Sequence, residues 1–231
     1  MLYLLSMRTL FAAMALLVTA NLNAQSSSPG NSADEDRILG IIPNYQTVSD
    51  PTPATPALTP LQKWQLAARE SYDPFSIATA GLGAYMSQAR NGDPQYGSHG
   101  GKALSQRFGA AVADETSQNL LADGLLATWL HEDPRYFRKG PGSRVLTRIG
   151  YALSRPFVTR MDSGRSSVNW SQLLGTTTGI ALSNAYYPAQ SRNASVSASR
   201  LITSMGGAAI GNLLPEFWPD IRKKFRHKPG Y

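Results

Sequence analysis

Three residues whose side chains can transfer protons or bind metals stand side by side at His131, Glu132 and Asp133. A hydrolase that acts on the cell envelope could use His131 with Glu132 or Asp133, because acid–base catalysis needs titratable groups close together. Consecutive residues of a helix point in different directions, however, and no HExxH motif is present. A simpler interpretation is a helix that ends at Asp133-Pro134, with local hydrogen bonds to its acids.

The sequence contains no motif for a metal or a cofactor. Its three histidines are far apart, so a multi-histidine zinc site would need distant loops. Gly97-Ser98-His99-Gly100 is not the G-x-S-x-G turn of a nucleophilic serine, and no glycine-rich phosphate loop appears. We therefore predict no metal and no cofactor, and we favour a non-enzymatic role.

Charge is divided unevenly along the chain. Residues 25–133 hold 12 acids and 6 bases, whereas residues 134–231 hold 3 acids and 15 bases. This asymmetry predicts either an anionic partner for the second half or docking of one half on the other. The strongest basic cluster is at the C-terminus, behind the aromatic pair Phe217 and Trp218, and consists of Arg222, Lys223, Lys224, Arg226 and Lys228. We expect it to contact an anionic membrane surface or an acidic envelope polymer, with a solvated basic tail as the alternative.

The N-terminus indicates export. An apolar run from Leu10 to Ala20 follows Arg8 and ends in small residues, as in a secretory signal peptide, and the best cleavage point is after Ala24. The run is shorter than the roughly 18 residues of a membrane-spanning helix. We therefore expect a periplasmic or outer-envelope location, which disfavours nucleic acid as the anionic partner. Because the chain has no cysteine, packing alone must hold the fold.

Two small-xxx-small patterns predict close helix packing. Gly175 and Gly179 form one pair, and Gly207 and Gly211 form the other. Four-residue spacing puts each pair on one face of its helix, where two backbones can approach closely. We expect the two pairs to meet in an antiparallel helical hairpin, and homo-oligomers through the same faces are an alternative.

The remaining pattern is helical. Capping signals begin helices at Thr59-Pro60, Asp73-Pro74 and Asn169, and apolar residues recur at helical spacing from Lys102 to Trp129. Further helices are expected over 144–158, bent or broken by Pro156, and over 196–214 and 217–225, and strand signals are scarce. The predicted fold is all-α, a single compact helical domain of about five to seven helices with Gly/Ala-rich interfaces. The predicted order is a signal peptide (1–24), a disordered and Pro-rich linker (25–58) with an apolar island (38–45), and the helical domain (59–231) with its basic tail.

Three polar segments carry a resemblance to other proteins. They are Asp133-Pro134-Arg135-Tyr136-Phe137, Asp162-Ser163-Gly164-Arg165 and Ser183-Asn184-Ala185-Tyr186-Tyr187-Pro188. With them, the chain resembles a set of exported bacterial proteins with no known activity, over most of the region from Phe75 to Phe217. The resemblance implies no catalytic residues.

Overall fold

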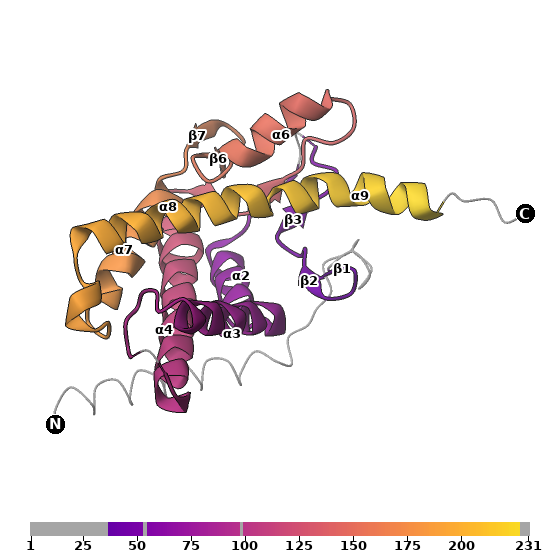
Figure 1. The fold of residues 1–231 in the computed structure, drawn as a ribbon. Coiled ribbons are helices and arrows are strands. Elements are labelled where there is room, and N and C mark those ends of the chain that lie inside the picture. Colours follow the sequence, from indigo (N-terminus) through magenta and orange to yellow (C-terminus); the bar gives the residue numbers. More distant parts are fainter. Residues whose placement is uncertain (1–36, 53–54, 98, 227–231) are drawn as a thin grey trace, which may run out of the picture. The chain divides into compact units, whose positions relative to one another are not determined.

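The computed structural model describes residues 37–52, 55–97 and 99–226. The described residues belong to one compact unit, and the predicted signal peptide and the start of the linker lie outside them. The protein is mostly helical, with 62% helix and 9% strand, so the all-α prediction holds only roughly. Figure 1 shows the helices crossing one another, with α8 and α9 running almost in line.

The helical elements, in chain order, are α2 (Pro60–Ser71), α3 (Pro74–Ala89), α4 (Gly101–Asn119), the π-helix η1 (Leu120–Leu126), α5 (Ala127–Trp129), α6 (Val145–Ser154), α7 (Trp170–Ser183), the 3-10 turn η2 (Ala189–Ser191), α8 (Ala194–Gly211) and α9 (Leu213–Arg226).

The capping signals begin helices where the sequence predicted. The Thr59 hydroxyl accepts from the Gln62 amide at 3.3 Å, and the Gln62 side chain accepts from the Thr59 amide at 2.9 Å, which completes a capping box for α2. Asp73 caps α3 by accepting from the Phe75 amide at 2.9 Å. Asn169 caps α7 through the Gln172 amide.

The strands form three small sheets. β1 (Arg37–Ile38) pairs antiparallel with β2 (Ile42–Pro43), and β3 (Thr47–Val48) pairs parallel with β5 (Tyr136–Phe137). β4 (Glu132–Asp133), β6 (Val158–Met161) and β7 (Ser166–Val168) form an antiparallel sheet with β6 in the centre. β1 and β2 lie in the apolar island, and Ile38 is buried there, whereas Leu39 and Ile41 are exposed.

The expected helix over 144–158 is broken before Pro156, and the segment beyond the break forms a β-hairpin in place of a further helical turn. α6 stops at Ser154, and the chain enters β6 after Pro156. Asp162 and Gly164 lie in the turn between β6 and β7, where Gly164 has a φ of +83° that favours glycine. The strands are short and partly exposed, so they leave no alternating pattern in the sequence.

The buried interior holds many small and charged side chains and few large apolar ones. The buried apolar residues are mostly alanines, which let the helix backbones approach closely. The largest fully buried side chains include Arg107, Lys63, Glu132 and Glu216. Each of these four charged groups has hydrogen-bond partners: the Lys63 ammonium, for example, lies 2.7 Å from an Asp162 carboxylate oxygen and donates to the Ala127 carbonyl oxygen.

All three acids of the basic half are bound internally. Asp162 pairs with Lys63, whereas Glu216 and Asp220 pair with Arg148, and Asp220 also pairs with Arg138. The first half supplies only one of these partners, Lys63. Two acids of the first half pair with bases of the second, Asp114 with Arg200 and Asp133 with Arg135, so docking of the two halves neutralises part of the basic surplus.

Candidate functional site

The structure places His131 in the turn after α5, and Glu132 and Asp133 on β4. The three side chains differ in exposure and in their partners. The His131 side chain is 79% exposed, and its Nδ1 lies 3.8 Å from an Asp162 carboxylate oxygen. Glu132 and Asp133 are both buried, and as neighbours on a strand they face opposite sides of it.

The buried carboxylates of Glu132 and Asp133 each bind a structural partner. Glu132 accepts from the amides of Trp170 and Ser171, at 3.3 and 2.8 Å, and so caps the N-terminus of α7. Asp133 binds the Arg135 guanidinium at 2.6 and 2.9 Å. None of the three residues lines the polar pocket that lies among α3, α4, η1, α7 and α8.

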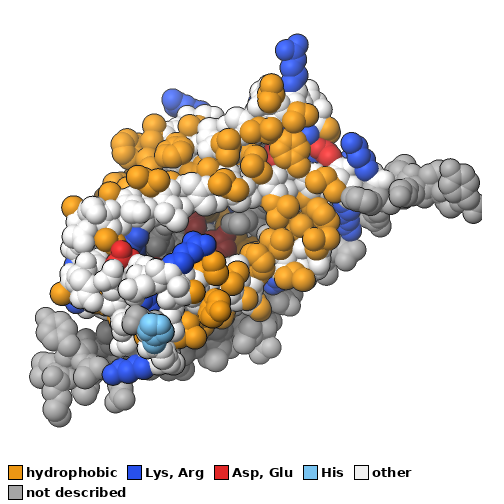
Figure 2. All heavy atoms as spheres, viewed as in Figure 1, with side chains coloured by type: hydrophobic (Ala, Val, Ile, Leu, Met, Phe, Trp, Pro, Cys, Tyr) orange, Lys and Arg blue, Asp and Glu red, His pale blue; other side chains and the backbone are white. Residues whose placement is uncertain are grey.

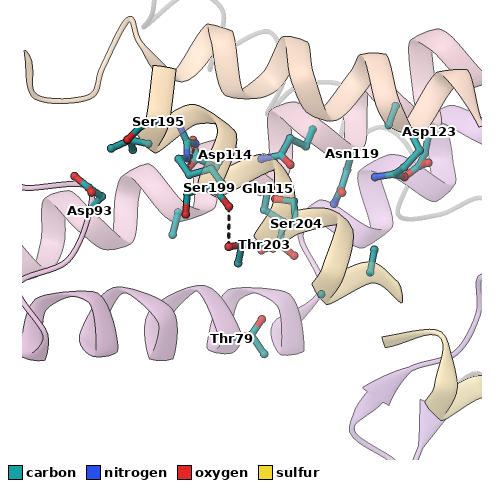
Figure 3. A pocket seen from close by; sticks show the side chains of 18 residues that line it. Thr79, Asp93, Asp114, Glu115, Asn119, Asp123, Ser195, Ser199, Thr203 and Ser204 are labelled. Atoms are coloured by element: carbon teal, nitrogen blue, oxygen red, sulfur yellow. Dashed lines mark hydrogen bonds and ion pairs between the residues drawn. The ribbon is translucent and has the colours of Figure 1, made fainter. Parts of the chain in front are cut away.

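This polar pocket has a volume of about 1240 Å³. Figure 3 shows its labelled side chains, with Asp93 and Asp123 at opposite ends of the view. The lining consists of carboxylates, amides, hydroxyls, one guanidinium and small side chains: Thr79, Asp93, Ala111, Asp114, Glu115, Gln118, Asn119, Ala122, Asp123, Gln172, Ser195, Val196, Ser199, Arg200, Thr203, Ser204, Gly207 and Ala208. Four of these residues are acidic and one is basic, so the pocket favours a polar ligand with positive charge.

One end of the pocket is rigidly built around Asp114. Its carboxylate accepts from the hydroxyls of Tyr186 and Tyr187 and from the Arg200 guanidinium at 2.9 Å. Arg200 also lies over the Tyr187 ring, with its guanidinium carbon 4.2 Å from the ring centroid. Burial and the Asp114 charge raise the pKa of both tyrosines, so their hydroxyls stay neutral donors. The only basic group of the lining is thereby already neutralised by Asp114.

The other end contains a pair of carboxyl groups that share a hydrogen bond. Asp123 on η1 is bonded to Glu70 on α2. Burial raises the pKa of Asp123 to about 6, against the lowering effect of that hydrogen bond. Burial, the Asp123 charge and the Glu115 charge hold the pKa of Glu70 well above its usual range. Asp123 therefore ionises as the pH rises past about 6, whereas the raised pKa of Glu70 favours its protonated form.

The π-helix η1 gives Asp123 its position. π-helical turns are rare and are frequently found at functional sites. On one side of η1, the ring of Trp64 packs against Gly124, where an added Cβ would lie 2.8 Å from a ring carbon. On another side α7 packs closely at Gly175. The turn is thus held between α2 and α7, and this brings Asp123 to Glu70.

Glu70, Asp114, Glu115 and Asp123 were not identified from the sequence as site residues. They lie on three helical elements, and although Asp114 and Glu115 are adjacent on α4, no motif links them to Glu70 or Asp123. One signal was available: the acid and glycine of Asp123-Gly124 interrupt the apolar spacing of residues 120–126. That interruption coincides with the π-helix.

The predicted glycine pairs do not meet each other, which corrects the expected hairpin. A Cβ on Gly175 would lie 2.5 Å from the Ala122 Cα, and one on Gly179 would lie 2.6 Å from the Gln118 Cγ. α7 therefore packs its glycines on η1 and α4. Gly207 and Gly211 have nothing within 4 Å of an added Cβ, since this face of α8 is open and partly lines the pocket.

Part of the predicted basic cluster lies on the exposed end of α9. Lys223 and Lys224 are exposed and Arg222 is half-buried. Arg226 is the last residue of α9, and its side chain and Lys228 lie outside the described residues.

Several large apolar side chains are exposed at the surface, whereas several charged side chains are buried in the interior. Leu146 on α6 is 82% exposed and Ile202 on α8 is 72% exposed. Figure 2 shows apolar side chains, with basic ones among them, over the area that α6 and the C-terminal part of α9 occupy in Figure 1. Contiguous exposed apolar surface marks contact sites for proteins, membranes or ligands.

Comparison with protein-family models, with curated proteins and with solved structures gives no match. Within the described part of the chain, no helix is both long and apolar enough to span a bilayer, and no group of three or more His, Asp or Glu side chains could hold a metal ion.

Proposed function

We propose that this protein is an exported, envelope-associated and non-enzymatic protein whose basic C-terminal half contacts an anionic surface. One observation carries the proposal: the exposed lysines of α9 belong to a half whose three acids are all bound internally. Its surplus positive charge is therefore available to an anionic partner. The signal-like N-terminus supports the proposed location.

The charge of α9 is tested by neutralising two lysines together. Each basic residue near an anionic bilayer contributes about 1 kcal/mol, so the double variant Lys223→Gln/Lys224→Gln should bind such vesicles about 30-fold more weakly. Flotation of the purified protein with phosphatidylglycerol-containing vesicles, over a series of lipid concentrations, measures this affinity.

The matched control neutralises two exposed basic residues elsewhere, Arg90 and Lys102. Arg90→Gln/Lys102→Gln should bind nearly as tightly as the parent. Equal losses of affinity in the two double variants would show that binding depends on the net charge of the protein and not on the position of the α9 lysines. A parent protein that ignores anionic vesicles at low salt would refute lipid as the surface.

The alternative of an envelope hydrolase that uses His131 with Glu132 or Asp133 receives less support. Glu132 and Asp133 are committed to capping α7 and to binding Arg135. His131 points into solvent, outside the pocket lining.

The polar pocket favours a second candidate function, the binding of a small ligand that carries ammonium groups. Asp123, which is hydrogen-bonded to Glu70, offers a carboxylate acceptor at one end of the pocket. Within the described chain, the side-chain amides of Gln118 and Asn119 also line the pocket and have no hydrogen-bond partner. The lining has no large apolar side chain that would select an apolar ligand.

Spermidine, a linear trivalent amine, is a suitable probe for this pocket. Raising the pH from about 5 to about 7.5 ionises Asp123, because the pKa of its carboxyl is raised to about 6, so the affinity should rise about tenfold. Isothermal titration calorimetry at the two pH values measures it. Asp123→Asn should weaken binding and abolish its pH dependence. Asp50→Asn, at an exposed site, should keep the affinity and the pH dependence of the parent. Equal behaviour of the two variants would reject the pocket as the site.

A further inference from the structure

The exposed face of α6 is apolar, and its buried face is charged. Leu146 and Leu153 are seven residues apart, which places them on one face of the helix, and they are 82% and 37% exposed. Phe157, just beyond the helix, is 48% exposed. The opposite face buries Arg148 and Ala152. A helix in water normally turns its apolar stripe inward, so α6 has the reverse orientation.

Glu216 on α9 maintains this orientation. Its carboxylate is fully buried, and Arg148 donates to it at 2.7 Å and to its main-chain carbonyl oxygen, also at 2.7 Å. Arg148 also pairs with Asp220 on α9 at 2.7 Å. Because α6 is fastened through its charged face, it cannot rotate its leucines inward without breaking buried ion pairs. The apolar face is a fixed feature of the surface.

The rim of the exposed apolar face is basic. Lys139 and Arg144, which precede α6, are both exposed. No acid occurs in the sequence between Asp133 and Asp162. On α9, which packs against α6, Ile221 is 41% exposed and is followed by the exposed Lys223 and Lys224.

We infer that α6 is a membrane-insertion element, which seats Leu146, Leu153 and Phe157 among the acyl chains of an anionic bilayer while Lys139 and Arg144 bind its headgroups. The apolar side chains match the acyl-chain layer of a bilayer, and the basic rim matches its anionic headgroups. An acidic protein or polymer would match the rim but would leave the leucines in water. The inference rests on the proposed function and narrows its anionic surface to a lipid bilayer.

A single-cysteine label tests the depth of α6 directly, since the chain has no cysteine of its own. We would introduce Leu146→Cys, label it with the environment-sensitive dye NBD, and add vesicles that contain phosphatidylglycerol. NBD emission should shift to the blue and be quenched by nitroxide groups on the acyl chains. The matched control is Leu82→Cys on α3, at a leucine that is 62% exposed, and its label should respond to neither.

A second variant measures the energetic contribution of the face. Leu146→Ser removes an apolar side chain from an exposed position, so the protein should fold normally and bind these vesicles about tenfold more weakly. Leu82→Ser should bind as the parent does. Soluble dextran sulfate serves as an acidic polymer without a bilayer, and Leu146→Ser should not alter its binding.

The possible outcomes separate this inference from the function on which it rests. Vesicle binding that depends on Lys223 and Lys224, with the label at 146 still in water, would overturn the inference and leave the proposed function intact. No vesicle binding by the parent would overturn the inference, and no binding to either vesicles or dextran sulfate would refute the proposed function as well. A blue shift at 146 that depends on protein concentration without vesicles would show that a second copy covers α6, and would also overturn the inference.

Discussion

Replacing Glu216 by glutamine is expected to lower the free energy of unfolding by about 3–5 kcal/mol, because it removes a fully buried carboxylate charge from the buried Arg148 guanidinium. The Glu216 carboxylate is fully buried and accepts four hydrogen bonds, from the Tyr136 hydroxyl, the amides of Lys139 and Gly140, and Arg148 Nε, at 2.7 to 3.1 Å. Glutamine has nearly the same shape, but its side chain has only one oxygen. Its NH₂ group would therefore point at N–H or O–H donors and could not accept their hydrogen bonds. The melting temperature should fall by about 10 °C.

Asp220→Asn is the matched control for Glu216→Gln. Asp220 pairs with Arg138 and Arg148 as well, but its side chain is 24% exposed, so water can replace part of what is lost. Its effect should be less than half as large. Thermal denaturation followed by circular dichroism compares the two. If Glu216→Gln melts within about 2 °C of the parent, the network does not fasten α9 to α6.

Replacing Gly175 by alanine is expected to destabilise the protein by about 3 kcal/mol or more, since the new Cβ would lie 2.5 Å from the Ala122 Cα and 2.6 Å from its backbone nitrogen. Backbone atoms cannot relieve the clash by a change of rotamer, as a flexible side chain can. α7 and η1 would have to separate, and this would also disturb Asp123 next to Ala122. Chemical denaturation measures the loss.

Other glycines provide a graded comparison for Gly175→Ala. At Gly179 the closest atom is the Gln118 Cγ, which is flexible, so Gly179→Ala should cost less. Gly211→Ala meets nothing within 4 Å and should be neutral or stabilise by up to about 1 kcal/mol through helix propensity. Equal stability of Gly175→Ala and Gly211→Ala would contradict the close approach of α7 to η1.

Helix ends were the most predictable part of the fold, because caps are local. The residue pairs Thr59 with Gln62, and Asp73 with Phe75, make their hydrogen bonds within three residues, so the sequence displays them directly. Strands β6 and β7 were missed because they are short and because one edge of β6 pairs with β4, whose partner residues lie 27 and 29 positions earlier. A strand that depends on a distant partner leaves little local pattern.

The pocket could not be predicted because its chemistry joins residues that are far apart in the chain. Glu70 and Asp123 lie on different helices, and only the packing of α2 on η1 makes them a pair. The reverse error occurred at Glu132 and Asp133, which are adjacent in sequence and look like a site. Burial gives them separate structural partners, the α7 N-terminus and Arg135.

The sequence by itself determined the helical class, the caps and the surplus of positive charge in the second half, because each depends on composition or on contacts within one turn. Only the tertiary structure decided which surface that charge occupies and which face of α6 points outward. The small-xxx-small spacing identified Gly175 and Gly179 as contact residues, but their partners, Ala122 and Gln118, were set by how α7 crosses α4 and η1. Such contacts depend on long-range packing, and a helix with two plausible faces cannot reveal from its own residues which one will be buried.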